Sequence, residues 1–175
     1  DITFRKKYML VFFMLIGAGS TASFFFIYEG YWMIAVIAYI LASIGFSGGN
    51  IFYDSLIIVV SNDQTRNQVS AFGYAMGYLG GGILFVVNVL MYLQPNIFGL
   101  ASEIDAVLFS FLSVAIWWSI FTLPLIKFVK ERKGEITSLS LISTVKNSFF
   151  RVINTFKEIR QYKNLFYFLV AYWLY

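Results

Sequence analysis

The chain has 175 residues, of which 59% are hydrophobic and 13% are charged, and its formal net charge is +4. Soluble domains average about 45–50% apolar and about 25% charged residues, so this composition favours a chain embedded in lipid. The sequence contains no histidine and no cysteine, which excludes a zinc site of the usual kind, a disulfide, a cysteine nucleophile and a histidine general base.

Four long apolar runs predict membrane-spanning helices at residues about 8–28, 31–60, 69–93 and 106–126. Each exceeds the roughly 18 residues that identify a spanning helix. The second run contains Asp54, the only acidic residue within any of the four. We therefore expect an all-α fold, a polytopic bundle of transmembrane helices.

Short polar segments precede the third and fourth runs and are expected to begin those helices. Ser61 and Gln64 have the S-x-x-Q spacing of a capping box before the third run. Ser102 is followed three positions later by Asp105, which predicts an N-cap before the fourth run.

Basic residues are confined to one set of connections. All 13 Lys and Arg precede the first run, lie between the second and third, or follow the fourth. The two opposite connections contain Glu29, Glu103 and Asp105 and no basic residue. Because basic loops stay in the cytosol, the chain is expected to start there, cross four times and return.

Residues 129–164 form the longest polar stretch and are interpreted as a cytosolic loop. Apolar residues within it recur at spacings of three and four, which predicts an amphipathic helix at about 142–161. A helix of this kind fits an interfacial linker, and a regulatory or partner-docking role stays open. Residues 165–175 are apolar but too short to span a bilayer, so they are expected to begin a further transmembrane helix, and the chain is expected to be a fragment.

Glycines in the third run form the most specific pattern of the sequence. Gly73, Gly77 and Gly81 repeat every four residues, with Gly80 and Gly82 beside them. Such small-residue spacing lets another helix backbone approach closely. The stripe therefore predicts helix packing, either static or as a pliable interface at which two bundles move.

Polar residues near the end of the second run are candidates for a solute cavity. Asn50 and Asp54 are four residues apart and share a helix face, with Tyr53 beside them. Polar groups within a membrane are costly and usually face a bundle interior or water. Asp54 could carry a proton, or pair with a cation such as Arg66 as a gate charge, or merely end the helix at the interface.

Three stretches resemble the vacuole-effluxer-like family of the major facilitator superfamily. Residues 50–56, NIFYDSL, resemble the F-Y-[ND] end of the family's fourth helix, and residues 69–82, VSAFGYAMGYLGGG, resemble the start of its fifth. Residues 164–175, NLFYFLVAYWLY, are similar to the start of its seventh. The resemblance implies helices three to six of a twelve-helix transporter, with 129–164 as the central loop between its halves.

The same resemblance implies solute export by alternating access, with amino acids as the substrates associated with the family. Asp1, Arg5 and Lys6 match positions of its D-R-x-G-R-[RK] signature and become gate-charge candidates, although Ile2 and Phe4 depart from it.

A secondary transporter is thus the leading function, and a small membrane scaffold or interaction protein is the alternative. A membrane enzyme is disfavoured because no paired carboxylates lie within the runs. We expect no cofactor, no metal and no nucleic-acid partner. The expected partners are membrane lipid, a small solute, a coupling proton and the remainder of the same chain. The expected location is a bacterial cell membrane, or a vacuolar-type membrane in a eukaryote.

Overall fold

The structure is a computed structural model that describes residues 6–130, 150–151, 153–155, 157–159 and 161–174. Within these ranges the regular structure is entirely helical. The elements are α1 (Lys6–Ser23), the 3₁₀-helix η1 (Phe24–Phe26), α2 (Trp32–Val60), α3 (Arg66–Leu93), the 3₁₀-helix η2 (Pro95–Phe98), α4 (Glu103–Phe128) and α6 (Lys163–Leu174).

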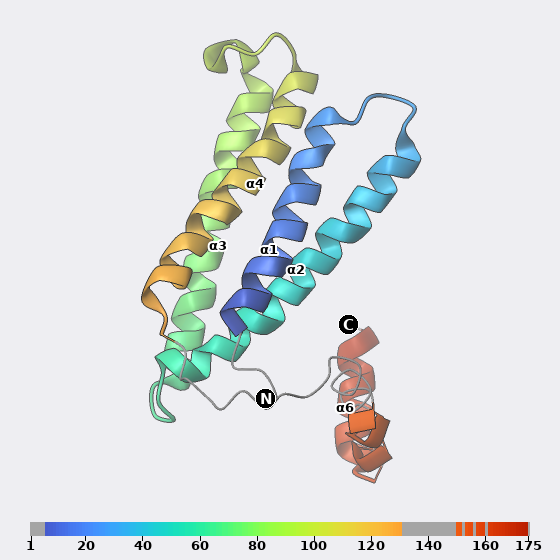
Figure 1. The fold of residues 1–175 in the computed structure, drawn as a ribbon, viewed down its shortest axis with the longest axis vertical. Helices are drawn as coiled ribbons and strands as arrows, with labels where there is room; N and C mark the ends of the chain where they lie inside the picture. The colour runs from blue at the N-terminus through green and yellow to red at the C-terminus, as the bar shows by residue number, and fades with distance from the viewer. Residues whose placement is uncertain (1–5, 131–149, 152, 156, 160, 175) are drawn as a thin grey trace. The chain divides into compact units, whose positions relative to one another are not determined.

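Helices α1 to α4 are long and apolar enough to cross a membrane. This confirms the all-α, multi-pass membrane architecture. In Figure 1 they run side by side, with successive helices antiparallel. α1 packs against both α2 and α4, and α3 packs mainly against α4. Only 6% of the residues in the most apolar segment of α3 are buried, the smallest share among the four helices. α3 is therefore the least covered helix of the described bundle.

A second unit contains the described residues from 150 onward and is considered by itself. The described residues within 150–159 are helical, and α6 follows as a 12-residue apolar helix. The predicted amphipathic helix at about 142–161 lies largely outside the described residues, as do the gate candidates Asp1 and Arg5.

Glycines allow α1 and α2 to approach at backbone contact. A methyl group on Gly45 would collide with the Cα of Gly17 and would lie 2.8 Å from the Phe13 carbonyl oxygen. One on Gly48 would collide with the Phe13 ring. This crossing is the small-residue packing typical of membrane helices, and it uses glycines of the first and second runs.

The buried cluster of the bundle joins α1 to α4 through Met14, Ala18 and Ala115. Trp118 of α4 packs against this cluster, and a side chain at Gly17 would collide with its indole. α3 is joined to α4 by a hydrogen bond in which the Ser113 hydroxyl donates to Asn88 Oδ1 at 2.8 Å.

The two predicted helix starts had different outcomes. Ser102 is the N-cap of α4, and its Oγ accepts a hydrogen bond from the Asp105 amide at 3.2 Å, which confirms that prediction. The capping box at Ser61 and Gln64 was wrong. The Ser61 hydroxyl donates to the Ile57 carbonyl of the preceding helix, and Asn62 Oδ1 instead accepts from the amide of Thr65, the residue before α3.

The first and fourth spans each depart from a regular α-helix. The α-helical part of the first span ends at Ser23, followed by η1, so it is shorter than the expected 8–28. The connection to α2 then turns at Gly30, whose φ of 91° is one that glycine adopts readily. α4 contains Pro124 inside its last turns, where a proline removes one backbone hydrogen bond.

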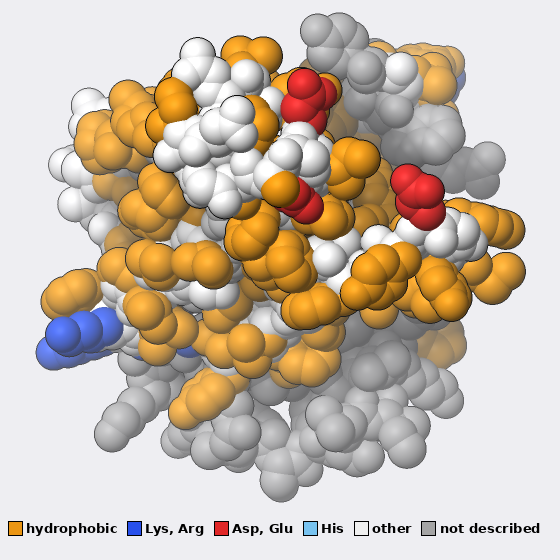
Figure 2. Space-filling view, turned by 90° about the horizontal axis from the view of Figure 1, so that it is seen from above, with side chains coloured by type: hydrophobic (Ala, Val, Ile, Leu, Met, Phe, Trp, Pro, Cys, Tyr) orange, Lys and Arg blue, Asp and Glu red, His pale blue; other side chains and the backbone are white. Residues whose placement is uncertain are grey.

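Lysines at the start of α1 bond backbone carbonyls of α4 and α2, and the carbonyl bound by Lys7 lies at a helix end. Lys7 Nζ donates to the Val129 carbonyl, just past α4, at 2.6 Å. Lys6 Nζ donates to the Ser55 carbonyl of α2 at 3.3 Å. Cations near helix C-termini complement the partial negative charge there. Figure 2 looks onto the opposite end of the bundle, where hydrophobic side chains predominate and acidic ones are scattered among them.

Candidate functional site

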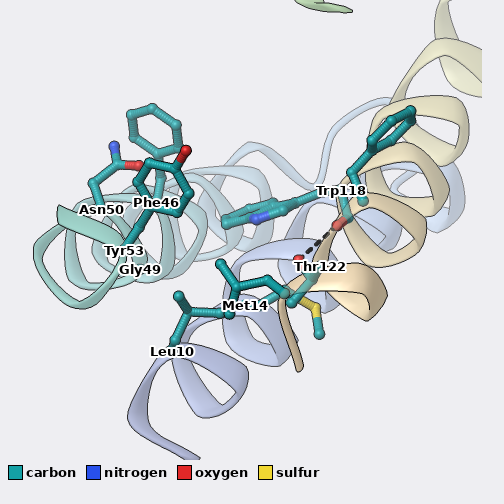
Figure 3. Close-up of a pocket in the computed structure, with 10 residues that line it drawn as sticks. Leu10, Met14, Phe46, Gly49, Asn50, Tyr53, Trp118 and Thr122 are labelled. Carbon is teal, nitrogen blue, oxygen red and sulfur yellow. Dashed lines mark hydrogen bonds between the residues drawn. The ribbon is translucent and has the colours of Figure 1, made fainter. Parts of the chain in front are cut away.

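A cavity of about 240 Å³ lies between α1, α2 and α4 (Figure 3). It is lined by Leu10, Met14, Phe46, Gly49, Asn50, Tyr53, Trp118, Phe121, Thr122 and Leu125. Figure 3 shows Asn50 and Tyr53 together on α2, with the Trp118 indole extending from α4 toward that helix. We call this space the Asn50 cavity.

The described residues that line the Asn50 cavity are mainly apolar and aromatic, and none of them carries a carboxylate, ammonium or guanidinium group. The Phe46 and Trp118 rings pack edge to face at 6.2 Å. The Thr122 hydroxyl donates a hydrogen bond to the Trp118 carbonyl at 2.8 Å. This leaves the Asn50 carboxamide and the Tyr53 hydroxyl to bind a polar group, and an apolar cavity with few polar groups is the usual form of a small-molecule site.

A second cavity of about 390 Å³ lies between α2, α3 and α4. Its polar lining includes the Asp54 carboxylate and the Ser70 hydroxyl, and Pro124 contributes to its wall. We call it the Asp54 cavity. Tyr53, Phe121 and Leu125 line both cavities, so the two adjoin along one shared wall.

The structure therefore brings the three cavity candidates to adjoining spaces. Asn50 lines one cavity, Asp54 lines the other, and Tyr53 lines both. All three side chains are exposed in the described bundle, so they are open to water, solute or further helices. Their role in binding stays a prediction.

The two gate-charge candidates among the described residues, Arg66 and Lys6, have other partners in this structure. Arg66 forms an ion pair with Asp63, three residues earlier in the chain. Among the described residues, Arg66 forms no other ion pair and Asp54 forms no ion pair at all. Lys6 bonds a backbone carbonyl of α2, as described above.

The glycine stripe of α3 divides into two parts. A methyl group on Gly73 would lie 3.4 Å from the Tyr53 hydroxyl oxygen, and one on Gly80 would lie 3.9 Å from the Trp117 ring. A methyl group on Gly77, Gly81 or Gly82 would meet no atom of the described residues within 4 Å. Packing of another helix on these three glycines stays a prediction.

Sequence reasoning missed the contributions of α1 and α4 to the cavities. The fourth run contains no charged residue, so its sequence predicts only a membrane span. It nevertheless supplies the cavity residues Trp118, Phe121 and Thr122. A tryptophan within such a run carries no local signal that distinguishes a cavity wall from a lipid-facing surface. In the described part of the chain, no group of three or more acidic residues is placed to hold a metal ion.

Comparisons with known proteins cover nearly the whole chain. The family model described as "Vacuole effluxer Atg22 like" matches residues 1–64 and 59–175. An uncharacterized MFS-type transporter, YxiO of Bacillus subtilis, is 38% identical over 174 residues, which is 97% of this chain and 39% of that protein. The chain therefore spans about two fifths of the length of this relative.

Fungal proteins are also similar. Autophagy-related protein 22 of Yarrowia lipolytica is 26% identical over 66% of this chain and 22% of its own length. Autophagy-related protein 22-1 of Neosartorya fischeri is 32% identical over 44% of this chain and 12% of its own length. No solved structure matches the chain.

Proposed function

Since the chain belongs to the vacuole effluxer Atg22-like family of major facilitator superfamily transporters, we propose that the complete protein is a secondary active transporter. It moves a small solute across the membrane by alternating access, in which two halves rock around a site near the midplane. The four spans of this chain supply part of one half.

The observation that carries this proposal is the polar face of α2. Asn50, Tyr53 and Asp54 lie within one helical turn and line two adjoining cavities between helices of the bundle. Polar groups inside a membrane are costly, and they mark solute or ion pathways in transporters. A scaffold that only packs its helices has no need of a carboxylate there.

Amino acids are the solute class that we propose. The Asn50 cavity can hold an apolar group against Phe46 and Trp118 while the Asn50 carboxamide bonds a polar group. Asp54, the acidic residue of this pathway, is the candidate carrier of a coupling proton.

The direct test uses the complete protein in proteoliposomes. Efflux and uptake of labelled neutral, acidic and basic amino acids are measured with and without a proton gradient. We expect saturable flux of at least one class that the gradient accelerates. Absence of flux for all classes, from protein that is correctly folded and inserted, would contradict the amino-acid proposal and favour the scaffold alternative.

Asn50→Ala serves as the matched site variant in this assay. It removes the carboxamide while leaving the apolar lining in place, so we expect a raised KM with the protein still inserted. Tyr78→Ala is the control, because Tyr78 is 82% exposed and lines neither cavity.

A further inference from the structure

Tyr53 lies at the boundary between two chemically different spaces. On one side is the Asn50 cavity, where no described lining residue is charged. On the other side is the Asp54 cavity, with a carboxylate and the Ser70 hydroxyl. Tyr53 is the residue of α2 that lines both.

The side chain of Tyr53 reaches from α2 toward α3. Its hydroxyl oxygen lies where a methyl group on Gly73 would touch it, at 3.4 Å. A larger residue at position 73 would compete with the hydroxyl for this space. The absence of a side chain at Gly73 therefore gives the tyrosine room to extend along the wall between the cavities.

Little holds the Tyr53 side chain in this position. It is 48% exposed, and among the described residues its hydroxyl makes no hydrogen bond. Exposed side chains change rotamer within picoseconds to nanoseconds. Phe121 also lines both cavities and is 58% exposed, but unlike Tyr53 it packs against a neighbouring ring, with its centroid 4.6 Å from that of Trp117.

We propose that Tyr53 is an internal gate: its ring separates the Asn50 cavity from the Asp54 cavity, and a rotamer change away from Gly73 joins them. This inference rests on the proposed transport function and assigns one step of it to a named side chain. Solute that enters past Asp54 then reaches Asn50 through the space that the ring leaves.

The test measures access rather than flux. The 175 residues contain no cysteine, so Asn50→Cys introduces the only thiol among them, in a complete protein from which any other cysteine has been removed. A charged, membrane-impermeant methanethiosulfonate reagent is applied from the membrane face on which Gln64 lies. The rate of modification is compared in the Tyr53, Tyr53→Phe and Tyr53→Ala backgrounds.

We expect Tyr53→Ala to raise the modification rate at position 50 by about tenfold or more, as loss of a closed gate should. Tyr53→Phe keeps the ring and should stay within about twofold of the parent, since the ring forms the barrier. Ser70→Cys, in the Asp54 cavity, should react at the same rate in all three backgrounds. Tyr78→Ala should change neither rate.

Equal rates at position 50 with Tyr53 and with Tyr53→Ala, whether both are fast or both undetectable, would overturn the proposal. An equal rise at position 70 would do the same, because it would indicate general loosening of the bundle. A rise with Tyr53→Phe as large as with Tyr53→Ala would overturn the assignment to the ring. Because no solute is needed, the gate can be upheld or rejected even where the flux assay of the proposed function fails.

Discussion

Gly17 and Gly45 bring the backbones of α1 and α2 into contact, with no side chain between them. The Trp118 indole of α4 also packs against Gly17, in the space that a side chain there would occupy. Three helices therefore meet around one residue that has no side chain, and this meeting point lies next to the Asn50 cavity, which Trp118 also lines.

Gly45→Ala is the first prediction. Its methyl group would collide with the Gly17 backbone, which cannot rotate aside as a side chain can. We expect a loss of about 1–3 kcal/mol, the usual cost of overpacking, seen as a lower midpoint of thermal unfolding in detergent. Gly19→Ala on α1 is the matched control, because a methyl group there meets nothing within 4 Å. An equal effect of both variants would indicate a glycine effect unrelated to the crossing.

The second prediction concerns the hydrogen bond between Ser113 and Asn88, which links α4 to α3 at 2.8 Å. Asn88→Ala and Ser113→Ala each remove it. We expect a coupling of about 0.6 kcal/mol in a double-mutant cycle of unfolding free energies, the average for such bonds between membrane helices. Strict additivity of the two single changes would mean that the bond contributes nothing to holding α3.

Asp54→Asn is the third prediction and keeps the shape of the side chain while removing its charge. If Asp54 carries the coupling proton, proton-driven flux should fall by about tenfold or more, as when a coupling free energy of about 1–3 kcal/mol is lost. Exchange of solute across the membrane without a gradient should be spared. Flux equal to that of the parent protein at every pH tested would remove Asp54 from the site.

Arg66→Gln tests whether Asp54 has this proton role or a gate-charge role, because Arg66 forms an ion pair with Asp63 in this structure. Since Arg66 is engaged by Asp63, Arg66→Gln should not reproduce the Asp54→Asn defect, and Asp63→Asn is its control. A matching defect in Arg66→Gln, with a double variant little worse than either single one, would instead support an Asp54–Arg66 gate.

The fourth prediction tests the topology inferred from the basic residues. Glu29, Gln64 and Asn96 lie in connections of the bundle and are exposed. Single cysteines at Glu29 and Asn96 should react with an impermeant thiol reagent added outside intact cells. One at Gln64 should react only after the membrane is permeabilised. Outside labelling at Gln64 would reverse or break the proposed orientation.

The spans and the family could be predicted from the sequence because both are local properties. Apolar runs of this length form helices in lipid, where every backbone group needs an internal partner. The N-cap at Ser102 was predictable for the same reason, since the bond to Asp105 joins residues three apart. Ser61 misled because the preceding helix offered it the Ile57 carbonyl, and a spacing rule does not weigh that competition.

Contacts between distant residues could not be predicted in this way. The glycine stripe of α3 is the most regular pattern in the chain, yet the backbone contact forms between Gly17 and Gly45, which lie in different runs. Which pair of small residues meets depends on how the helices cross. Asn50, Tyr53 and Asp54 were found because they are polar. The role of Trp118 became visible only in the folded bundle, where α4 packs against α1 and the indole reaches Phe46 of α2.

Pro124 bears on the hydration of the Asp54 cavity. A proline at this position leaves the Ile120 carbonyl without its helical amide donor, and an unsatisfied carbonyl in hydrocarbon costs several kcal/mol. Pro124 lines the Asp54 cavity, which is large enough to admit water. We therefore expect that cavity to be hydrated, with water beside the Asp54 carboxylate that also lines it.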